Sequence, residues 1–243
     1  EASHSAGPNS MTPSVLTLEE LAERLGRDRR EVEKLADRGR IPGRKRDGRW
    51  QFHDSEVTSW LEQELRDYSP EELRQVAETH RSEEIHHEEP LTSLLRPETV
   101  AVPLEGRTKR GVLEALMEAA GASYQVWDPA RLLHAVTERE ELCSTAFPGG
   151  VAVPHPRNQL ADALGESVVA CGVTSKGVPF GAPDGRLTDV FFLVLCRDAR
   201  THLHVLARIG RLLHVDGLVD GLREAPDSVA AYDLIHETDD QLG

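Results

Sequence analysis

His155 is the residue of this chain whose setting best suits covalent chemistry, because it stands between two prolines in Val153-Pro-His-Pro156. Proline restricts its own backbone and that of the residue before it, so the imidazole is presented from a stiff turn at the end of an apolar run. A histidine held in this way could act as a nucleophile, whose lone pair must already point at the incoming group. An ordinary histidine in a proline-rich turn fits the same residues, and the tetrapeptide alone favours that plainer interpretation.

Other histidines and the cysteines could bind a metal. His86 and His87 are adjacent, with no nearby cysteine and no suitably spaced third ligand, so we interpret them as part of an exposed linker. The cysteines form no CxxC pair and lie in apolar or strand-like surroundings, which favours reduced core thiols. They are Cys143, Cys171 and Cys196. We therefore expect no metal site and no cofactor.

The elements that must position His155 lie between residue 91 and the end of the chain. Apolar runs at residues 151–153, 167–173 and 189–196 are continuously hydrophobic, as strands covered on both faces are. Helical patterns alternate with them near residues 109–120, 129–142, 201–213, 215–225 and 228–236. This alternation implies a sheet between helical layers.

The first part of the chain has the pattern of a helix-turn-helix. Thr17-Leu-Glu-Glu20 is a capping box, and Gly26 ends the helix that it starts. Asp28 caps a second helix, which Gly39 closes. Asp47-Gly48 then predicts a hairpin between basic and aromatic arms, which is typical of a wing, and a third helix follows it.

Positive charge is concentrated in this first part. The whole chain has a formal net charge of −14, which argues against a general nucleic-acid binder. Residues 24–49, however, hold 11 Lys or Arg against 5 Asp or Glu, whereas residues 66–90 hold 3 against 8. A basic module therefore lies within an acidic chain.

The order helix, turn, helix, basic hairpin, helix resembles the excisionase and MerR-type winged-helix family from Val15 to about Leu65. The runs Leu18-Glu-Glu-Leu-Ala22 and Arg38-Gly-Arg-Ile-Pro42 support the likeness. The resemblance implies DNA binding, with the second helix at the major groove and the wing on phosphates. The cations so placed are Arg27, Arg29, Arg30 and Lys34 on the helix and Arg44, Lys45, Arg46 and Arg49 on the wing. A solvated charged surface is the alternative, since acids of the second helix could pair with its arginines.

A charged segment separates the two parts of the chain. Ser69-Pro70-Glu-Glu72 predicts a helix start, but the stretch that follows has little to bury. Its thin apolar stripe could pair weakly with a second copy; the stripe consists of Leu73, Val76, Ala77 and His80. Residues 83–90 have the pattern of an exposed tether. Near the N-terminus, Met11 resembles an initiating methionine, so we expect a disordered leader or tag over residues 1–13.

The stretch from Leu91 onward resembles the fructose, mannitol and nitrogen-regulatory type of phosphotransferase-system IIA domain. Three motifs agree with the family in order and spacing: Glu138-Arg-Glu140 with Cys143-Ser-Thr145, then Gly149-Gly-Val-Ala-Val-Pro-His155, then Thr201-His-Leu203 at a helix start. In that family the histidine after Val-Pro accepts phosphate from a small histidine-phosphorylated carrier protein. The resemblance therefore implies that His155 is the phosphoryl acceptor.

The same match implies roles for four further residues. His202 is the second site histidine and Arg139 the site arginine, while Ser144 and Thr145 lie on the adjoining loop. Arginine would offer a planar donor fork to phosphoryl oxygens, and the others would supply further hydrogen bonds. Arg139 could equally be a surface ion-pair partner, and His202 a helix-cap residue. His204 is excluded from the second-histidine role, because residues two apart on a helix face different directions.

Two positions depart from the family pattern. Pro156 and Arg157 follow the histidine where members often have glycine and lysine or threonine, which makes this exit stiffer and more basic. Gly149-Gly150 replaces a small polar residue that many members carry, which removes a possible side-chain donor. The second departure bears on the stability of a phosphorylated state more than on its formation.

These patterns together predict an α+β protein. After the leader we expect a winged helix-turn-helix over residues 14–66, a charged helical linker over 67–90, and over 91–243 a IIA domain with three α/β/α layers and a mixed sheet. No apolar run has the roughly 20 residues that a membrane helix needs, so we expect a cytoplasmic protein.

The expected function is a phosphorylation-controlled regulator. An HPr-type carrier would phosphorylate His155, and the winged helix would bind DNA. It could do so as a homodimer, because one small winged helix covers little DNA. Two alternatives stay open. One is a DNA-binding transcription factor with a degenerate IIA sensor or oligomerisation domain; the other is the IIA component of sugar transport, which would pass phosphate to a separate IIB protein.

Overall fold

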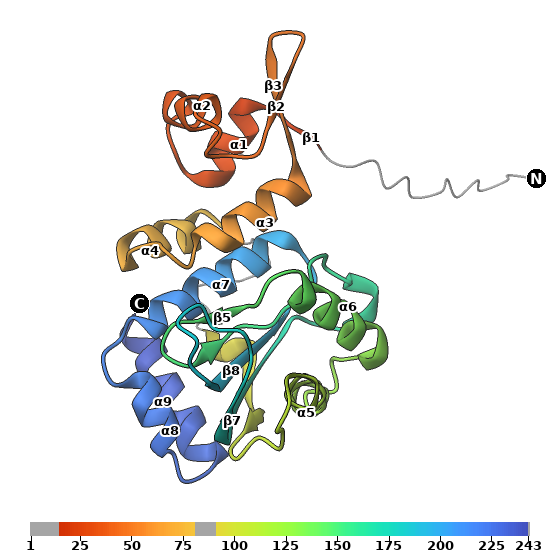
Figure 1. The fold of residues 1–243 in the computed structure, drawn as a ribbon, viewed down its shortest axis with the longest axis vertical. Helices are drawn as coiled ribbons and strands as arrows, with labels where there is room; N and C mark the ends of the chain where they lie inside the picture. The colour runs from red at the N-terminus through yellow and green to blue at the C-terminus, as the bar shows by residue number, and fades with distance from the viewer. Residues whose placement is uncertain (1–14, 81–90, 243) are drawn as a thin grey trace, which may run out of the picture. The chain divides into compact units, whose positions relative to one another are not determined.

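The computed structural model describes residues 15–80 and 91–242, and the chain divides into two compact units between Leu61 and Glu62 (Figure 1). The histidine pair His86-His87 and the expected leader over residues 1–13 lie outside the described residues. Each unit is described by itself below. The division falls inside one helix, so this helix contributes residues to both units.

The smaller unit has the helix-turn-helix and the wing that its sequence predicts. Its helices are α1 (Leu18–Leu25), α2 (Arg29–Asp37) and the first part of α3 (Asp54–Glu64), and its strands are β1 (Val15–Leu16), β2 (Arg44–Arg46) and β3 (Arg49–His53), in the order β1-β3-β2. The Thr17 hydroxyl accepts from the Glu20 amide, and Gly26 is left-handed, as the capping pattern predicted. Asp47 and Gly48 both have positive φ, which is the conformation of a type I′ hairpin turn.

A small apolar core holds this unit together. Leu21, Val32, Phe52 and Val57 are each fully buried. On β3 the Trp50 ring stacks on the buried Phe52 with centroids 5.6 Å apart. The sequence therefore predicted the helices and the hairpin of this unit, but not the two-residue strand β1.

The larger unit is built on a five-stranded mixed sheet with the order β4-β7-β8-β6-β5. The strands are β4 (Leu95–Ala101), β5 (Ala146–Phe147), β6 (Val151–Ala152), β7 (Val168–Val178) and β8 (Thr188–Leu195). The helices that begin within this unit are α4 (Pro70–Thr79), α5 (Lys109–Gly121), α6 (Pro129–Leu142), α7 (Ala199–Leu213), α8 (Leu218–Glu224) and α9 (Ser228–Gln241), with short 3₁₀ turns at Leu91–Ser93 and Ala161–Ala163.

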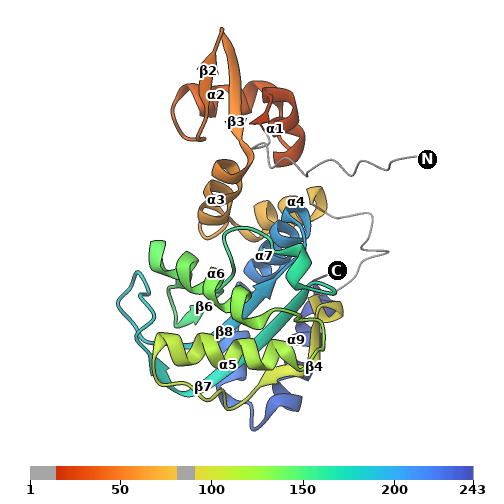
Figure 2. The same ribbon diagram turned by 90° about the vertical axis from the view of Figure 1, so that its right-hand side faces the viewer.

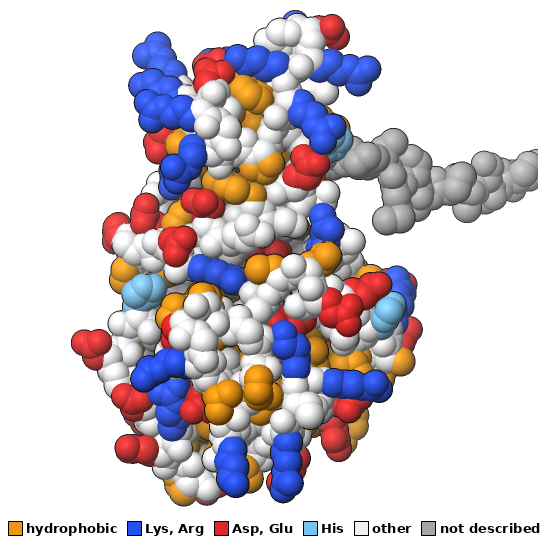
Figure 3. Space-filling view, viewed as in Figure 1, with side chains coloured by type: hydrophobic (Ala, Val, Ile, Leu, Met, Phe, Trp, Pro, Cys, Tyr) orange, Lys and Arg blue, Asp and Glu red, His pale blue; other side chains and the backbone are white. Residues whose placement is uncertain are grey.

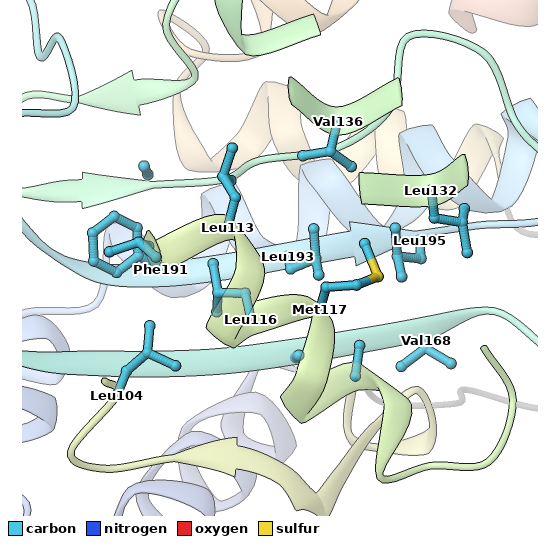
Figure 4. Close-up of a cluster of buried hydrophobic side chains, with 14 of the residues drawn as sticks. Leu104, Leu113, Leu116, Met117, Leu132, Val136, Val168, Phe191, Leu193 and Leu195 are labelled. Atoms are coloured by element: carbon cyan, nitrogen blue, oxygen red, sulfur yellow. The ribbon is translucent and has the colours of Figure 1, made fainter. Parts of the chain in front are cut away.

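Helices cover both faces of this sheet, which confirms the expected α/β/α layers. Helices α5 and α6 lie on one face and α7, α8 and α9 on the other (Figures 1 and 2). Alternate residues of each central strand enter opposite cores: Phe191 and Leu193 of β8 pack with α5 and α6, whereas Phe192 packs with α7 and α9. Figure 4 shows the first of these cores, where Leu113, Leu116 and Met117 of α5 meet β8. Two buried faces explain why these strands read as unbroken apolar runs.

Three elements differ from the sequence-based expectations. The edge strand β4 was not expected, because its sequence contains Pro97 and polar residues and its pairing with β7 shifts register between Leu95 and Val100. The two-residue strand β5 is too short to leave a pattern. Helix α8 begins at Leu218, since left-handed Gly217 interrupts the helical pattern expected from Val215.

The charged segment before residue 80 forms helix α4, which lies along α7 within the larger unit (Figure 1). From the sequence, weak pairing of its apolar stripe with a second copy was one suggestion. In the structure Leu73, Val76 and Ala77 are buried, and Leu73 is the side chain nearest the position that a Cβ on Gly210 of α7 would take. The stripe is thus covered by the same chain. Among the described residues, no helix is long and apolar enough to cross a membrane.

The cysteines differ in burial, which predicts their reactivity. Cys171 and Cys196 are fully buried among the strands, as expected of core thiols, but that expectation was wrong for Cys143, which is exposed. Burial raises the pKa of the Cys171 thiol to about 12, so its reactive thiolate is scarce at neutral pH. We expect a thiol-specific alkylating agent to label only Cys143 in the native chain and all three cysteines in denaturant. Peptide mass mapping checks this result, and labelling of Cys171 without denaturant would contradict it.

Candidate functional site

His155 is held at the end of β6 by main-chain hydrogen bonds. The carbonyl of Pro154 accepts from the Val194 amide of β8 at 3.0 Å, and the Val153 amide donates to Thr145 at 3.2 Å. The ring atom Nδ1 of His155 lies 2.7 Å from the Val153 carbonyl oxygen. A carbonyl can only accept, so Nδ1 carries a proton, and in the neutral ring the lone pair is on Nε2. Strand, turn and tautomer together aim Nε2 at the site.

His202 faces His155 from the first turn of α7. The helix is capped by Asp198, whose carboxylate accepts from the amide and the hydroxyl of Thr201. The ring centroids of His155 and His202 are 4.9 Å apart, in an edge-to-face arrangement. Both side chains are buried. Because the start of a helix carries partial positive charge, this end of α7 favours an anion beside the histidines.

Arg139 brings a fixed positive charge to the same place. It lies in the last turn of α6 and is 5% exposed, and its Nη1 donates to the carbonyl of Cys143 at 2.9 Å. Its Nη2 lies 3.8 Å from a carboxylate oxygen, and the same carboxylate group lies beside both histidines. The structure therefore brings Arg139, His155 and His202 together from three separate elements.

The carboxylate is that of Glu62, which the sequence analysis did not single out. Its Oε1 lies 2.9 Å from Nε2 of His202, and its Oε2 lies 3.4 Å from Nε2 of His155. Glu62 is 4% exposed although it comes from a highly charged stretch. Nothing in that stretch distinguishes it from the exposed acids around it, since only long-range packing buries it.

Burial and contacts with neighbouring groups shift the pKa values of Glu62 and His202 in opposite directions. Burial alone would raise the pKa of the Glu62 carboxyl, but the imidazoles of His155 and His202 outweigh burial and hold that pKa well below its usual range. Burial lowers the pKa of His202 in spite of the carboxylate. We therefore describe Glu62 as ionised and His202 as neutral, with its Nε2 proton donated to Glu62.

Residues 93–238 of the chain match the sequence profile of the family described as "Phosphoenolpyruvate-dependent sugar phosphotransferase system, EIIA 2". The chain belongs to this EIIA 2 family. Residues 15–64 match a helix-turn-helix domain profile as well. The chain is therefore a IIA domain that follows a helix-turn-helix domain, and we call the larger unit the IIA unit.

Curated relatives of the IIA unit include both regulatory and transport proteins. A nitrogen regulatory protein of Pseudomonas aeruginosa is 30% identical over 147 residues, which are 60% of this chain and 94% of that protein. A fructose-specific EIIA component of Haloferax volcanii is 29% identical over 132 residues, which are 54% of this chain and 84% of that protein. The matches therefore do not choose between the two kinds of role.

Solved structures agree with the fold of the IIA unit. The nitrogen regulatory protein IIA-Ntr of Neisseria meningitidis superposes with a TM-score of 0.54 at 22% identity, covering 60% of this chain and 98% of its own. The IIA component in a complex of IIA and phosphorylated IIB for mannitol from Escherichia coli gives 0.53 at 18% identity, with 59% and 99% coverage. At these identities the likeness concerns the fold.

The two loop residues expected beside the IIA histidines direct their hydroxyls elsewhere. Ser144 donates to the Phe180 carbonyl at 2.8 Å, and the hydroxyl of Thr145 donates to Glu140 at 2.6 Å. Glu140 is buried and also accepts from the Thr145 amide and from Lys109. Its carboxylate thus organises this loop, a positioning role that the expected motif of Glu138-Arg-Glu140 did not reveal.

The Gly149-Gly150 departure has a conformational reason in this IIA unit. Both glycines have positive φ, which other residues adopt with difficulty. A Cβ on Gly150 would come within 2.7 Å of the Arg223 guanidinium and within 3.1 Å of the Leu187 carbonyl. A small polar residue at this position would therefore strain the turn that leads into β6.

The eight candidate DNA-contacting cations are exposed or half-buried in the helix-turn-helix unit, and Lys and Arg side chains gather over α2 and the wing (Figure 3). Four of them lie within 4 Å of acids: Arg27 of Glu31, Arg29 of Glu19 and Glu33, Arg44 of Glu56, and Lys45 of Asp37. The other four have no ion pair with a described residue; they are Arg30, Lys34, Arg46 and Arg49. Part of the basic surface is thus internally neutralised, as the solvated-surface alternative supposed.

Glu62, His155 and His202 could also be considered as metal ligands. One ligand atom from each lies within 4.8 Å of the others, and two histidines with one glutamate is a ligand set known for zinc. The Arg139 guanidinium, however, lies 3.8 Å from the same carboxylate. A fixed cation at this distance favours an anion over a second cation. The charges of the site therefore suit a phosphoryl group better than a metal ion.

Proposed function

We propose that the IIA unit accepts a phosphoryl group on Nε2 of His155 from an HPr-type phosphocarrier. The hydrogen bond between Nδ1 of His155 and the Val153 carbonyl carries this proposal, because it leaves the lone pair on Nε2. That lone pair forms the new nitrogen–phosphorus bond while the bond to the carrier's histidine breaks. The electron pair of the broken bond stays on the carrier's imidazole, so no oxidant or further reactant is required.

Arg139 and His202 would stabilise the transferred group. The guanidinium offers donors to two phosphoryl oxygens at once, and the neutral His202 offers its Nε2 proton. The first turn of α7 adds its partial positive charge to the same side of the site. Ser144 and Thr145 would act by holding the loop in place, since their hydroxyls and the Thr145 amide are engaged elsewhere.

A phosphotransfer assay with the full chain tests the proposal. Incubation with phosphoenolpyruvate, enzyme I and the HPr-type carrier should add the mass of one acid-labile phosphoryl group, and peptide mapping should place it on His155. A chain of unchanged mass, with the carrier itself fully phosphorylated, would favour a degenerate sensor domain instead.

We further propose that the helix-turn-helix unit binds DNA and that the phosphoryl group on His155 regulates this binding. The unit's basic α2 and wing support the first part, and the added negative charge supplies a physical cause for the second. A gel-shift titration at low salt, with phosphorylated and unphosphorylated chain, tests both parts. Absence of any shift together with transfer of phosphate to a IIB cysteine would favour a role in sugar transport.

A further inference from the structure

Glu62 fills the place that a phosphoryl group on His155 needs. Its carboxylate lies against Nε2 of both histidines and faces Arg139, the three groups that would otherwise meet phosphoryl oxygens. A cavity of about 20 Å³ remains between Glu62 and His155, which has room for about one water molecule. A carrier's phosphohistidine cannot reach Nε2 along its lone pair while this carboxylate is in place.

We propose that residues 62–79 form a built-in cover of the phosphoryl site, with the Glu62 carboxylate standing in for the phosphoryl group. This inference rests on the proposed function of His155 and adds its regulation. The cover and the phosphoryl group compete for the same donors, so phosphorylation requires the cover to open, and phosphohistidine keeps it from closing.

Helix α4 anchors the cover away from the histidines. Leu73 is fully buried against α7, where the nearest atoms to a Cβ on Gly210 would be those of Leu73. At the other end of the contact, Nδ1 of His204 lies 2.8 Å from the Ala77 carbonyl of α4 and donates to it. His204, which helical geometry excluded from the phosphoryl site, therefore holds the cover instead.

The residues between Glu62 and α4 continue the contact. Leu65 is buried, and the Arg66 guanidinium lies 5.5 Å from the centroid of the Phe147 ring on β5. Both residues line the small cavity beside His155. Contacts along the residues that follow Glu62, from Leu65 to α4, thus hold this segment against the site.

Charge repulsion prevents the Glu62 carboxylate and a phosphoryl group on His155 from being in the site at the same time. The phosphoryl group carries between one and two negative charges, and an ionised carboxylate cannot share its donors at contact distance in a buried site. The closed form also withholds the nucleophile, because Nε2 of the buried His155 lies 3.4 Å from Glu62 Oε2 and does not face solvent. Only the open fraction of molecules can react, so the apparent transfer rate falls in proportion to that fraction.

The cover also has a covalent route to the helix-turn-helix unit. Glu62 lies in α3, and the same helix begins among residues of that unit. Opening the cover therefore releases the end of a helix whose earlier turns belong to the proposed DNA-binding unit. A phosphoryl group on His155 would thus affect the helix-turn-helix unit by freeing the end of α3.

Two variants open the cover by different means. Leu73→Asp places a carboxylate in the α4–α7 contact and leaves every residue of the phosphoryl site intact. Glu62→Ala removes the occupant itself. The matched controls are Gln75→Asp on the exposed face of α4 and Glu64→Ala two residues beyond Glu62. Far-UV circular dichroism and a melting curve establish that each variant is folded.

Accessibility of His155 is measured without any phosphorylation. Diethyl pyrocarbonate acylates the neutral ring nitrogen, and peptide mass mapping gives the rate at His155. We expect about a tenfold or greater increase in this rate for Leu73→Asp and Glu62→Ala, and wild-type rates for both controls. Equal rates at His155 in wild type and both variants would overturn the cover.

Phosphotransfer from the HPr-type carrier is then timed on the same proteins. Faster labelling of Leu73→Asp than of wild type and Gln75→Asp supports the cover as a regulator, and equally fast labelling of all three overturns it. If no protein is labelled while the acylation rates differ as expected, the cover stands and the proposed phosphoryl acceptance fails.

Discussion

The His155→Ala variant is expected to take up no phosphoryl group under conditions that fully label the wild-type chain. The reason is specific to one atom. The Val153 carbonyl holds the proton on Nδ1 of His155, so in the neutral ring the nucleophilic lone pair is on Nε2. Alanine removes the nucleophile, whereas the strand and turn that hold it depend on main-chain bonds of Val153 and Pro154, which do not need the imidazole. Intact mass after incubation with the carrier measures the result.

Neighbouring histidines provide the controls for this prediction. His134 is exposed on α6, and His134→Ala should be labelled like wild type. His202→Ala keeps the nucleophile and loses one donor to the phosphoryl group, so it should slow labelling by about 10²- to 10³-fold without abolishing it. Full labelling of His155→Ala would show that another residue is the acceptor and would remove the basis for the proposed function.

The sequence was informative about the site wherever a residue's role is tied to local main-chain structure. His155 follows a strand and lies between prolines, and His202 starts a capped helix, so their motifs keep a fixed order along the chain. Arg139 is recognisable for the same reason, since it lies in the last turn of the helix before the loop that contacts the end of β6. The family match explains why these three could be named before any geometry was known.

Glu62 and the cover could not be found in that way. Glu62 lies among several acids, and its burial depends on His202, which is 140 residues away in the chain. The apolar stripe of α4 was visible in the sequence, but a stripe predicts that a helix packs without identifying its partner. The partner here includes Gly210, whose missing side chain makes room for Leu73. Edge strand β4 was missed for a related reason, because its pairing is irregular and its sequence is polar.

The basic surface of the helix-turn-helix unit is expected to depend on four cations. Arg30, Lys34, Arg46 and Arg49 are exposed and have no ion pair with a described residue, whereas the other candidates share acids of their own unit. A cation that is already paired must give up its partner to bind phosphate, so it contributes less to DNA affinity. Replacing all four unpaired cations by alanine should weaken DNA binding by about 10²- to 10³-fold at 0.1 M salt.

Salt dependence separates this prediction from a general effect of charge. Each lost phosphate contact should lower the slope of log affinity against log salt by about 0.9, so the quadruple variant should lose a slope of about 3 to 4. The control removes four exposed cations from the IIA unit instead: Arg107, Arg110, Lys176 and Arg186. It changes the net charge equally and should keep nearly the wild-type slope. Equal losses in the two variants would mean that DNA responds only to the chain's overall charge, and the solvated-surface alternative for α2 and the wing would then hold.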